Sequence, residues 1–534
     1  MNIQLIIIIY AKDLIIRGIL VRSSYILTNR KNLPTLEYSL QKLENTECEI
    51  YELNSYFSIC ILQNTKPIKE KIFYADKGNL ICLIGQIYNR LELYNLLMSF
   101  DALAINYNDA ELFFKLYLHF KKYVTQIIDG AFTAFITTQE QCLIFTNSTP
   151  TFPLYYYNHP GNFWITNEVK LLINVSTIHT KLKPVTEINP KKIYTEDFTI
   201  FEYIKKVPKN HLMKCTPNHI SDKVRVKIIP CRKYFIEESI NIPQLELKDK
   251  LHYLFNNIIQ NYCEKTSNIG IALSGGIDSS LVATYHKRLF PENTLYSFTI
   301  GSEKINEFHY ANTCAHHVNS IHRNIVFDET MFLEGLLNLI YFNEMFDSYL
   351  IEVHAIMDHI YKLCANSTQI MLTGFNADNL FGANISPDLP LEIVNKVLLN
   401  KNCRPSWTGE YNPYLSYKYG LSTRSPYLSN KFFSLMYRID AKIKIYEQNL
   451  KYPLKLLASD YELLPQENIW RKKQNLERGA ANDLIFSEFL KKENSVSYTS
   501  KTLFCYEVFR LIFEKKIPYY NLDLYEVRKS LLGY

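Results

Sequence analysis

The chain has 534 residues, which at about 100–200 residues per domain predicts two large domains or three smaller ones. Hydrophobic residues make up 47% and charged residues 21%, which is typical of a folded protein and excludes a disordered chain. The 59 Lys and Arg exceed the 53 Asp and Glu by six. This mild excess permits an anionic ligand, but there is no dense basic block, so we expect no nucleic-acid partner.

The cysteines and the apolar run near the N-terminus bear on where in the cell the protein is expected. The 11 Cys are odd in number and scattered, without a C-x-x-C pair, so neither a disulfide framework nor a zinc site is predicted. Residues 5–10 (LIIIIY) are far fewer than the roughly 20 apolar residues of a spanning helix, and no signal-peptide pattern surrounds them. We expect a first β-strand there, a cytoplasmic location and no membrane partner.

The first part of the chain, up to about residue 200, has short apolar stretches separated by turns. Apolar residues at helical spacing predict one helix over 111–124. The remaining stretches are rich in β-branched and aromatic residues, which predict strands. These are residues 2–10, 60–63, 79–84, 130–137, 142–145, 154–157 and 163–166. We therefore expect mostly antiparallel sheet with a few helices.

From about residue 245 strands and helices alternate, which predicts a parallel sheet with right-handed crossovers. A helix is expected over 279–290, and strands over 268–273, 294–300, 324–327 and 369–373. Prolines at 208, 217, 230 and 243 indicate a connecting region before this part. The predicted domains are 1–207 and 245–534, joined by 208–244.

The segment IALSGGIDSS runs from an apolar strand through two glycines into an amphipathic helix. Gly275 and Gly276 allow a tight turn and close approach to a ligand, and the first amides of the helix favour phosphate. Ser274 and Ser279 add hydroxyl donors, and Asp278 can hold a magnesium ion against phosphates. A capped strand-to-helix turn explains a bare glycine pair, but the complete pattern favours phosphate binding.

This S-G-G-x-D-S segment resembles the pyrophosphate loop of ATP pyrophosphatases, which split ATP to AMP and diphosphate. The Walker pattern G-x-x-x-x-G-K-[ST] is absent. The resemblance implies carboxylate adenylation, in which a carboxylate attacks the α-phosphate and an amine then opens the acyl-adenylate. It assigns nucleotide contacts to Leu273, Ser274, Gly275, Gly276, Asp278, Ser279, Ile300, Thr373 and Gly374.

The segment LTGFNADNLFG, residues 372–382, resembles the G-x-G-x-D-x-x-F-G block of asparagine synthetases, with Asn376 in place of the second glycine. The resemblance implies that this strand end borders adenosine and that Asp378 shares magnesium with Asp278. Carboxylates at the carboxyl ends of two strands in one parallel sheet suit such a site. Taken alone, Asp378 is also explained as a helix N-cap, and the two roles are compatible.

The segment WRKK ending at Lys473, with Gly479 after it, resembles a W-R-x-K…G segment whose lysine stabilises charge on the adenylate and the tetrahedral intermediate. A lysine in a basic run is usually a solvated surface residue, but the order and approximate spacing favour a catalytic Lys473. Residues 423–428 (TRSPYL) resemble the R-x-P-F-L start of a helix, to which we assign a structural role.

Residues 410–416 (EYNPYLS) resemble a segment of β-lactam synthetase in which the glutamate and a tyrosine form a proton-abstracting dyad. That tyrosine falls at Phe375, which has no proton to exchange. We expect Glu410 to act as a base or to orient one. The alternative is an exposed loop glutamate without a catalytic role.

The first half resembles the N-terminal-nucleophile (Ntn) glutaminase domain of asparagine synthetase. Such an enzyme needs a cysteine as its first residue after Met removal, because its α-amine activates the thiol. Here the second residue is Asn2, and the oxyanion-hole asparagine is replaced by Ile84, which cannot donate a side-chain hydrogen bond. We therefore expect an inactive scaffold. The matching motifs are 85–89 (GQIYN), 108–111 (NDAE), 129–135 (DGAFTAF), 153–156 (PLYY) and 167–172 (NEVKLL).

We therefore expect an α/β and α+β two-domain protein, with an Ntn-hydrolase-like sandwich before a parallel-sheet ATP-pyrophosphatase domain of the adenine nucleotide α-hydrolase-like type. This combination describes β-lactam synthetases and the cyclases that close the macrolactam ring of lasso peptides such as microcins. The lasso cyclase is the closer likeness. Residues 374–384 (GFNADNLFGAN) resemble its G-x-x-x-D-x-x-F-G-x-N stretch, and 517–522 (IPYYNL) loosely resemble a late L-P-Y-containing segment.

The resemblance implies an ATP- and Mg²⁺-dependent ligase that joins a side-chain carboxylate of a precursor peptide to its N-terminal amine. Its products besides the ring are AMP and diphosphate, and its expected partners are the peptide and a leader peptidase. An asparagine synthetase that uses ammonia from solution is the alternative, as is a β-lactam-type cyclisation of a small molecule. An idle scaffold or an ATP-dependent binding protein is disfavoured because the phosphate loop, both aspartates and Lys473 occur together.

Overall fold

The computed structural model divides the chain into two compact units, residues 1–234 and 235–534. The described residues are 6–8, 23–29, 47–63, 72–100, 107–147, 153–175, 177–183, 199–208, 210–218, 223–231, 240, 242–263, 268–383, 389–403, 415–446, 449–471, 482–490 and 497–532. In this part of the chain, no helix is both long enough and apolar enough to cross a membrane.

The first unit contains two antiparallel sheets, as its strand pattern predicts. Within the described residues, one sheet has seven strands in the order β1-β3-β4-β2-β10-β9-β11, and the other has six in the order β13-β12-β8-β7-β6-β5. The bounds are β1 Ile6–Ile8, β2 Ser23–Asn29, β3 Glu47–Glu52, β4 Phe57–Gln63, β5 Phe73–Asp76, β6 Asn79–Ile87, β7 Gly130–Thr137, β8 Cys142–Thr146, β9 Tyr155–His159, β10 Asn162–Thr166, β11 Ile204–Lys206, β12 His211–Asn218 and β13 Lys223–Pro230.

The second of these sheets is buried on both faces, because side chains of a strand alternate between two cores. On β6, Cys82 and Ile84 pack in a core that also contains Leu27 and Phe163 from the first sheet. Leu83, between them, packs instead in a core with the helices. This explains why β7 and β8 are nearly continuous apolar runs rather than alternating ones.

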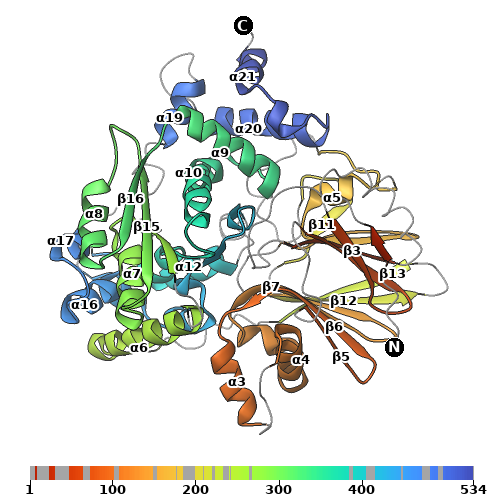
Figure 1. The fold of residues 1–534 in the computed structure, drawn as a ribbon, viewed down its shortest axis with the longest axis horizontal. Coiled ribbons are helices and arrows are strands. Elements are labelled where there is room, and N and C mark those ends of the chain that lie inside the picture. Colours follow the sequence, from red (N-terminus) through yellow and green to blue (C-terminus); the bar gives the residue numbers. More distant parts are fainter. Residues whose placement is uncertain are drawn as a thin grey trace. The chain divides into compact units, whose positions relative to one another are not determined.

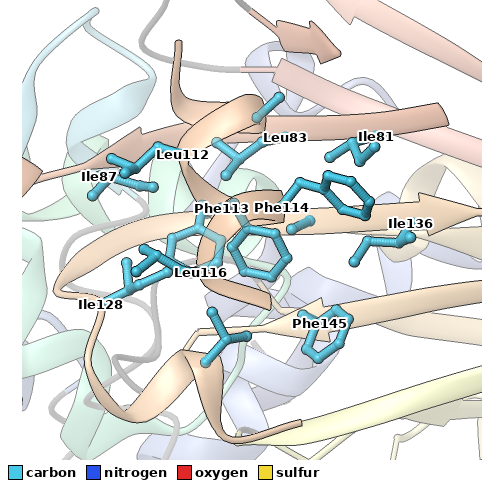
Figure 2. Close-up of a cluster of buried hydrophobic side chains, with 14 of the residues drawn as sticks. Ile81, Leu83, Ile87, Leu112, Phe113, Phe114, Leu116, Ile128, Ile136 and Phe145 are labelled. Atoms are coloured by element: carbon cyan, nitrogen blue, oxygen red, sulfur yellow. The ribbon is translucent and has the colours of Figure 1, made fainter. Parts of the chain in front are cut away.

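Helices cover the other face of the second sheet. These are α3 Arg90–Met98, α4 Asp109–Phe120 and η2 Lys121–Gln126, and a short α5 Val169–Ile173 follows β10. Figure 2 shows Leu112, Phe113 and Leu116 from α4 packed against Leu83 and Phe145. The helix predicted over 111–124 therefore exists, but its last part is a 3-10 helix.

The boundary between the units differs from the predicted connecting region. Residues 211–218 and 223–230 form β12 and β13, which pair along eight residues and add to the six-stranded sheet of the first unit through β8. Pro217 lies one residue before the end of β12, and Pro230 is the last residue of β13. A proline is tolerated where its missing N–H is not needed by the ladder, so proline spacing alone was a misleading signal.

The second unit is built on a parallel sheet. In the described residues its strand order is β16-β15-β14-β17-β18, and every neighbouring pair is parallel. The bounds are β14 Asn268–Ala272, β15 Thr294–Gly301, β16 Ile321–Val326, β17 Ile370–Leu372 and β18 Ser422–Arg424. The chain reverses its direction of progress through the sheet between β14 and β17, and ligands of such sheets bind at the carboxyl ends of the strands at that point.

Helices flank this sheet on both faces. The bounds are α6 Gln244–Cys263, α7 Ile277–Leu289, α8 Phe308–His317, α9 Glu329–Asn343, α10 Ser348–Ala365, α11 Ala377–Phe381, α12 Leu391–Cys403, η4 Pro426–Leu428, α14 Asn430–Met436, α15 Ala441–Lys444, α16 Tyr452–Asp460, α17 Gln466–Trp470, α19 Asn482–Leu490, α20 Tyr498–Phe513, η5 Tyr519–Asn521 and α21 Leu524–Leu532. Figure 1 shows α8 on one side of β15 and β16 and α10 on the other.

Candidate active site

The phosphate loop lies between β14 and α7, where the sequence places it. Gly275 has a φ of +69°, and a Cβ there would lie 2.3 Å from the carbonyl carbon of Tyr310 on α8. Only glycine fits both constraints. Gly276 is the N-cap of α7 in an extended conformation, and no side chain caps the helix there. The first amides of α7 are therefore available to an anion.

The hydroxyls of the loop hold its backbone closed. The Gly276 amide donates to Ser274 Oγ at 3.3 Å, and the Ser274 amide donates to Ser279 Oγ at 3.3 Å. The two hydroxyl oxygens are 3.4 Å apart. Both serines therefore shape the turn before any ligand arrives, in addition to their predicted role as phosphate donors.

The second strand end, after β17, packs directly against the start of α7. A Cβ on Gly374 would lie 2.7 Å from the Ser279 amide nitrogen, so only glycine allows this approach. Asn376, which replaces a family glycine, has a left-handed φ of +74°. Asn tolerates this region better than most residues, so the substitution preserves the turn. Asn376 is also the N-cap of α11, and Asp378 lies in the first turn rather than at the cap.

Asp278 and Asp378 converge, and a lysine that the sequence analysis did not identify joins them. The Lys451 ammonium pairs with Asp278 Oδ2 and lies 2.5 Å from Asp378 Oδ1. Its side chain is only 5% exposed. Burial alone lowers the pKa of an ammonium, but the two carboxylates outweigh that effect and the pKa of Lys451 is raised. The site thus holds two negative charges and one buried positive charge.

Local sequence provides little signal for Lys451. The residue is the N-cap of α16 and has a left-handed φ of +58°, just before Tyr452 and Pro453. Pro453 at the start of a helix is a recognisable signal for the helix, but not for a charged site residue.

A second group of side chains, on and after α17, hydrogen-bonds to backbone carbonyls of the phosphate loop. The Asn468 amide on α17 donates to the carbonyls of Gly275 and Tyr310, both at 2.9 Å. Arg471, which follows α17, donates to the Ser274 carbonyl at 3.1 Å and pairs with Glu307. In a peptide unit the N–H points opposite to the carbonyl, so these bonds direct the amides of Gly275 and Gly276 away from α17.

The segment at the end of β18, the strand that pairs with β17 on the side away from β14, also supports the site. Residues 423–428, predicted as the start of a helix, include the end of β18 and the 3-10 helix η4, and α14 follows directly. Their structural role agrees with the prediction: Ser425 Oγ donates to the Phe375 carbonyl at 2.6 Å, and the buried Tyr427 hydroxyl donates to the Asp278 carbonyl at 3.1 Å. A three-residue strand is too short to be recognised from periodicity.

The remaining predicted nucleotide contacts lie on the same sheet edge. Leu273 and Ile300 are buried, at 1% and 6% exposure. Leu273 donates its amide to the Phe298 carbonyl of β15 at 2.9 Å. Thr373 is buried as well, and its Oγ1 has no hydrogen-bond partner among the described residues. A buried hydroxyl of this kind suits a polar ligand atom.

Two predicted catalytic residues cannot be placed. Lys473 and Glu410 both lie outside the described residues, as do Gly479, Asn384 and Asn2. Phe375, which stands where the dyad tyrosine was expected, is half-buried beside Gly374.

In the first unit, the position predicted for the oxyanion-hole donor is an apolar side chain, Ile84. Ile84 is 1% exposed and packs in the apolar core between the two sheets. The following Gly85 has a φ of +116° and lies so close to β7 that a Cβ would be 2.0 Å from the Ala131 carbonyl oxygen. The strand geometry is therefore that of a tight backbone site, but the adjacent side chain is a core isoleucine.

Both units of the chain match known protein families. Residues 250–398 and 414–517 match the family model for asparagine synthase, and residues 58–225 match the glutamine amidotransferase domain. The carboxyethyl-arginine beta-lactam-synthase of Streptomyces clavuligerus is 24% identical over 408 residues, which cover 76% of this chain and 75% of that protein. The glutamine-hydrolyzing asparagine synthetase of Gallus gallus is 25% identical over 441 residues, which cover 75% and 72%.

The fold and the matches define a glutamine amidotransferase-type antiparallel sandwich followed by a parallel-sheet adenine nucleotide α-hydrolase domain, which confirms the predicted fold class. The chain belongs to the asparagine synthetase and β-lactam synthetase superfamily. It is an ATP-dependent carbon–nitrogen ligase of the asparagine synthetase-like family, whose members form amide bonds.

Proposed function

We propose that this ligase closes a macrolactam ring in a peptide, by adenylating a side-chain Asp or Glu carboxylate that the peptide's own N-terminal amine then attacks. One contrast carries the proposal. Charged side chains converge at the ends of β14 and β17, whereas the position of the glutaminase oxyanion donor is the buried Ile84. A ligase whose aspartates and phosphate loop are assembled, and whose amidotransferase unit has an isoleucine at the predicted oxyanion position, suits an amine already present in its substrate.

The first step is adenylation. A carboxylate oxygen attacks the α-phosphorus of ATP, the bond between the α- and β-phosphates breaks, and diphosphate leaves. The amides at the start of α7 and the hydroxyls of Ser274 and Ser279 are positioned to bind the departing diphosphate. Gly374 lets the second strand end come close enough to border the rest of the nucleotide.

Magnesium fits the carboxylates of Asp278 and Asp378. Both are hard oxygen ligands, and the pair already shares one cation, the Lys451 ammonium. No group of three or more His, Cys, Asp or Glu side chains that could hold a metal lies within the described part of the chain. Two carboxylates plus substrate phosphates are a usual set for Mg²⁺, which supplies positive charge against the developing charge on diphosphate.

The second step is amide formation. The amine nitrogen attacks the acyl carbon, AMP leaves with its bonding electrons, and the amine gives its proton to a base. We assign charge stabilisation to Lys473 and proton removal, direct or indirect, to Glu410. Lys473→Ala should then slow ring closure more than it weakens ATP binding. Glu410→Gln should slow attack by the amine while adenylation stays measurable.

A peptide substrate is favoured because its amine and carboxylate are parts of one molecule. Positioning then replaces the high amine concentration that a separate nucleophile needs. A leader peptidase that exposes the amine, and a cytoplasmic location where ATP and precursor meet, belong to the same proposal. The curated relatives act on small substrates by their names, so β-lactam-type closure and asparagine formation are the competing outcomes.

The test is mass spectrometry of synthetic peptides incubated with the enzyme, ATP and Mg²⁺. The peptides carry a free N-terminal amine and one Asp or Glu at varied positions. Loss of one water in a product that stays cyclic after proteolysis is the expected result. The matched control is the N-acetylated peptide, which should support ATP–diphosphate exchange but form no ring. Efficient asparagine formation from aspartate and ammonia, with every peptide left linear, would overturn the proposal.

A further inference from the structure

Lys451 occupies the place where a cation is needed to hold Asp278 and Asp378 together. Its ammonium contacts one oxygen of each carboxylate, and its side chain is almost completely buried. Without it, two carboxylates would face each other at a partly buried site with like charge. The lysine therefore stabilises the convergent arrangement in the absence of any metal ion.

The same contacts place Lys451 in competition with a divalent cation. A magnesium ion needs carboxylate oxygens at about 2.1 Å in near-octahedral geometry. On these two carboxylates, such an ion would lie next to an ammonium that water cannot screen, because the Lys451 side chain is buried. A second cation, Arg471, also interacts electrostatically with Asp278, but its charge is neutralised by an ion pair with Glu307.

Nucleotide phosphates change this balance. A triphosphate is an anion that can accept both the metal and the ammonium, so the repulsion between the two cations is offset when they share it. The loop geometry favours phosphate binding at this place, since Gly374 at the second strand end packs against Asp278 and the Ser279 amide at the start of α7. Metal and nucleotide should therefore bind with positive coupling, and the coupling is reciprocal.

We propose that Lys451 is a built-in counter-cation of the Asp278–Asp378 pair, which keeps free divalent ions out of the nucleotide-free enzyme and admits magnesium only together with the nucleotide. The inference rests on the proposed magnesium role of the two aspartates and not on the identity of the carboxylate substrate. It makes Lys451 a positioning residue for the metal and predicts the order in which the site is filled.

The experiment measures binding of free Mn²⁺ to the full chain by electron paramagnetic resonance, without nucleotide or substrate. Wild type should bind weakly, and Lys451→Met should bind about tenfold tighter or more, because the competing charge is gone. The control is Lys455→Met, one helical turn further along α16. Lys455 is half-buried near the Trp470 ring and pairs with neither aspartate, so its loss should change Mn²⁺ affinity by about twofold at most.

A double variant locates the ion. Lys451→Met combined with Asp378→Asn should lose the gained affinity, because one ligand is missing. Equal Mn²⁺ affinity in wild type and Lys451→Met, or a gain that survives Asp378→Asn, would overturn the proposal. If Lys451→Met does not fold, the unfolding temperature of the wild type still tests the proposal. Mg²⁺ alone should not raise its unfolding temperature, whereas Mg²⁺ with a non-hydrolysable ATP analogue should. Stabilisation by Mg²⁺ alone would count against the counter-cation. None of these outcomes depends on a peptide being the substrate.

Discussion

Gly85 in the first unit and Gly275 in the second are comparable positions with different surroundings. Both have positive φ values, +116° and +69°, and a Cβ on either would collide with backbone, of Ala131 and Tyr310 respectively. Beside Gly85 stands the buried Ile84, whereas the loop of Gly275 carries serine hydroxyls and is bonded by Asn468. A tight, glycine-dependent backbone thus lies beside a core isoleucine in one unit and beside polar side chains in the other.

The comparison also separates two kinds of buried charge. At the ends of β14 and β17, buried charges have opposite charges in contact, as Lys451 does with two aspartates. Elsewhere in the second unit, the fully buried Lys444 has an amide partner, Asn395, and the ring of Tyr437 nearby. Charge pairing at strand ends, rather than burial of charge as such, marks the chemistry.

The largest expected effect comes from removing a site carboxylate. Asp278→Asn and Asp378→Asn should each lower AMP formation about 1000-fold or more, because each removes a carboxylate from the proposed magnesium site and leaves Lys451 with one carboxylate instead of two. Rates of AMP release and calorimetry of a non-hydrolysable ATP analogue with Mg²⁺ measure this. Asp460→Asn, which removes an exposed partner of Lys248, is the control and should retain activity. Wild-type rates in both site variants would remove these aspartates from the mechanism.

The next largest effect tests whether the hydrogen bonds from Asn468 to the phosphate loop and to α8 contribute to ATP binding. Asn468→Leu deprives the Gly275 and Tyr310 carbonyls of their donor, which should raise the KM for ATP about tenfold and change kcat less. Steady-state kinetics with the preferred substrate provide both constants. Gln466→Leu, on the same helix but bonded only to the exposed Trp470 ring nitrogen, should leave both unchanged. An unaltered KM in Asn468→Leu would reduce Asn468 to a packing residue.

A buried charge outside the site should cost stability. Burial lowers the pKa of Lys444 to about 7, with Asp440 partly opposing the shift. The unfolded lysine keeps its proton up to its ordinary pKa of 10.5, so the wild-type unfolding free energy contains a penalty at pH 7 that fades as the pH rises toward 10.5. Lys444→Met should therefore stabilise the protein by about 2 kcal/mol at pH 7.

Denaturant unfolding at pH 7 and pH 10 checks this prediction, because the advantage of Lys444→Met over wild type should shrink at the higher pH. Lys442→Met, exposed on the same short helix, is the control and should change little at either pH. A destabilised Lys444→Met variant would show that the bond to Asn395 outweighs the burial of the charge.

The smallest expected effect is none at all. Labelled glutamine should release no glutamate above background, because Ile84 cannot donate the hydrogen bond that stabilises the oxyanion of hydrolysis. Ile84→Asn should restore no hydrolysis either, since Asn2, at the position where the nucleophile is expected, has no thiol. Isotope detection of glutamate measures both, and clear hydrolysis by wild type would contradict the contrast between the two units.

The sequence by itself determined the class of each unit and most of the site. Local apolar patterns were sufficient for the antiparallel character of the first unit and for four of the five strands of the parallel sheet, but not for every strand of the sandwich. The phosphate loop, Gly374 and both aspartates could be predicted as site residues because the motifs that suggest their roles are short and lie at strand ends. The expected lack of a side-chain oxyanion donor followed from a single residue, Ile84.

Only the tertiary structure decided what completes the site. Lys451 lies 173 residues after Asp278 and in no recognised motif, so its pairing depends on where α16 begins relative to two strand ends. Asn468 reaches the loop through a fold contact across 193 residues. Strands β12 and β13 were missed because a proline excludes a ladder bond only at certain positions, and those positions are set by the neighbouring strand.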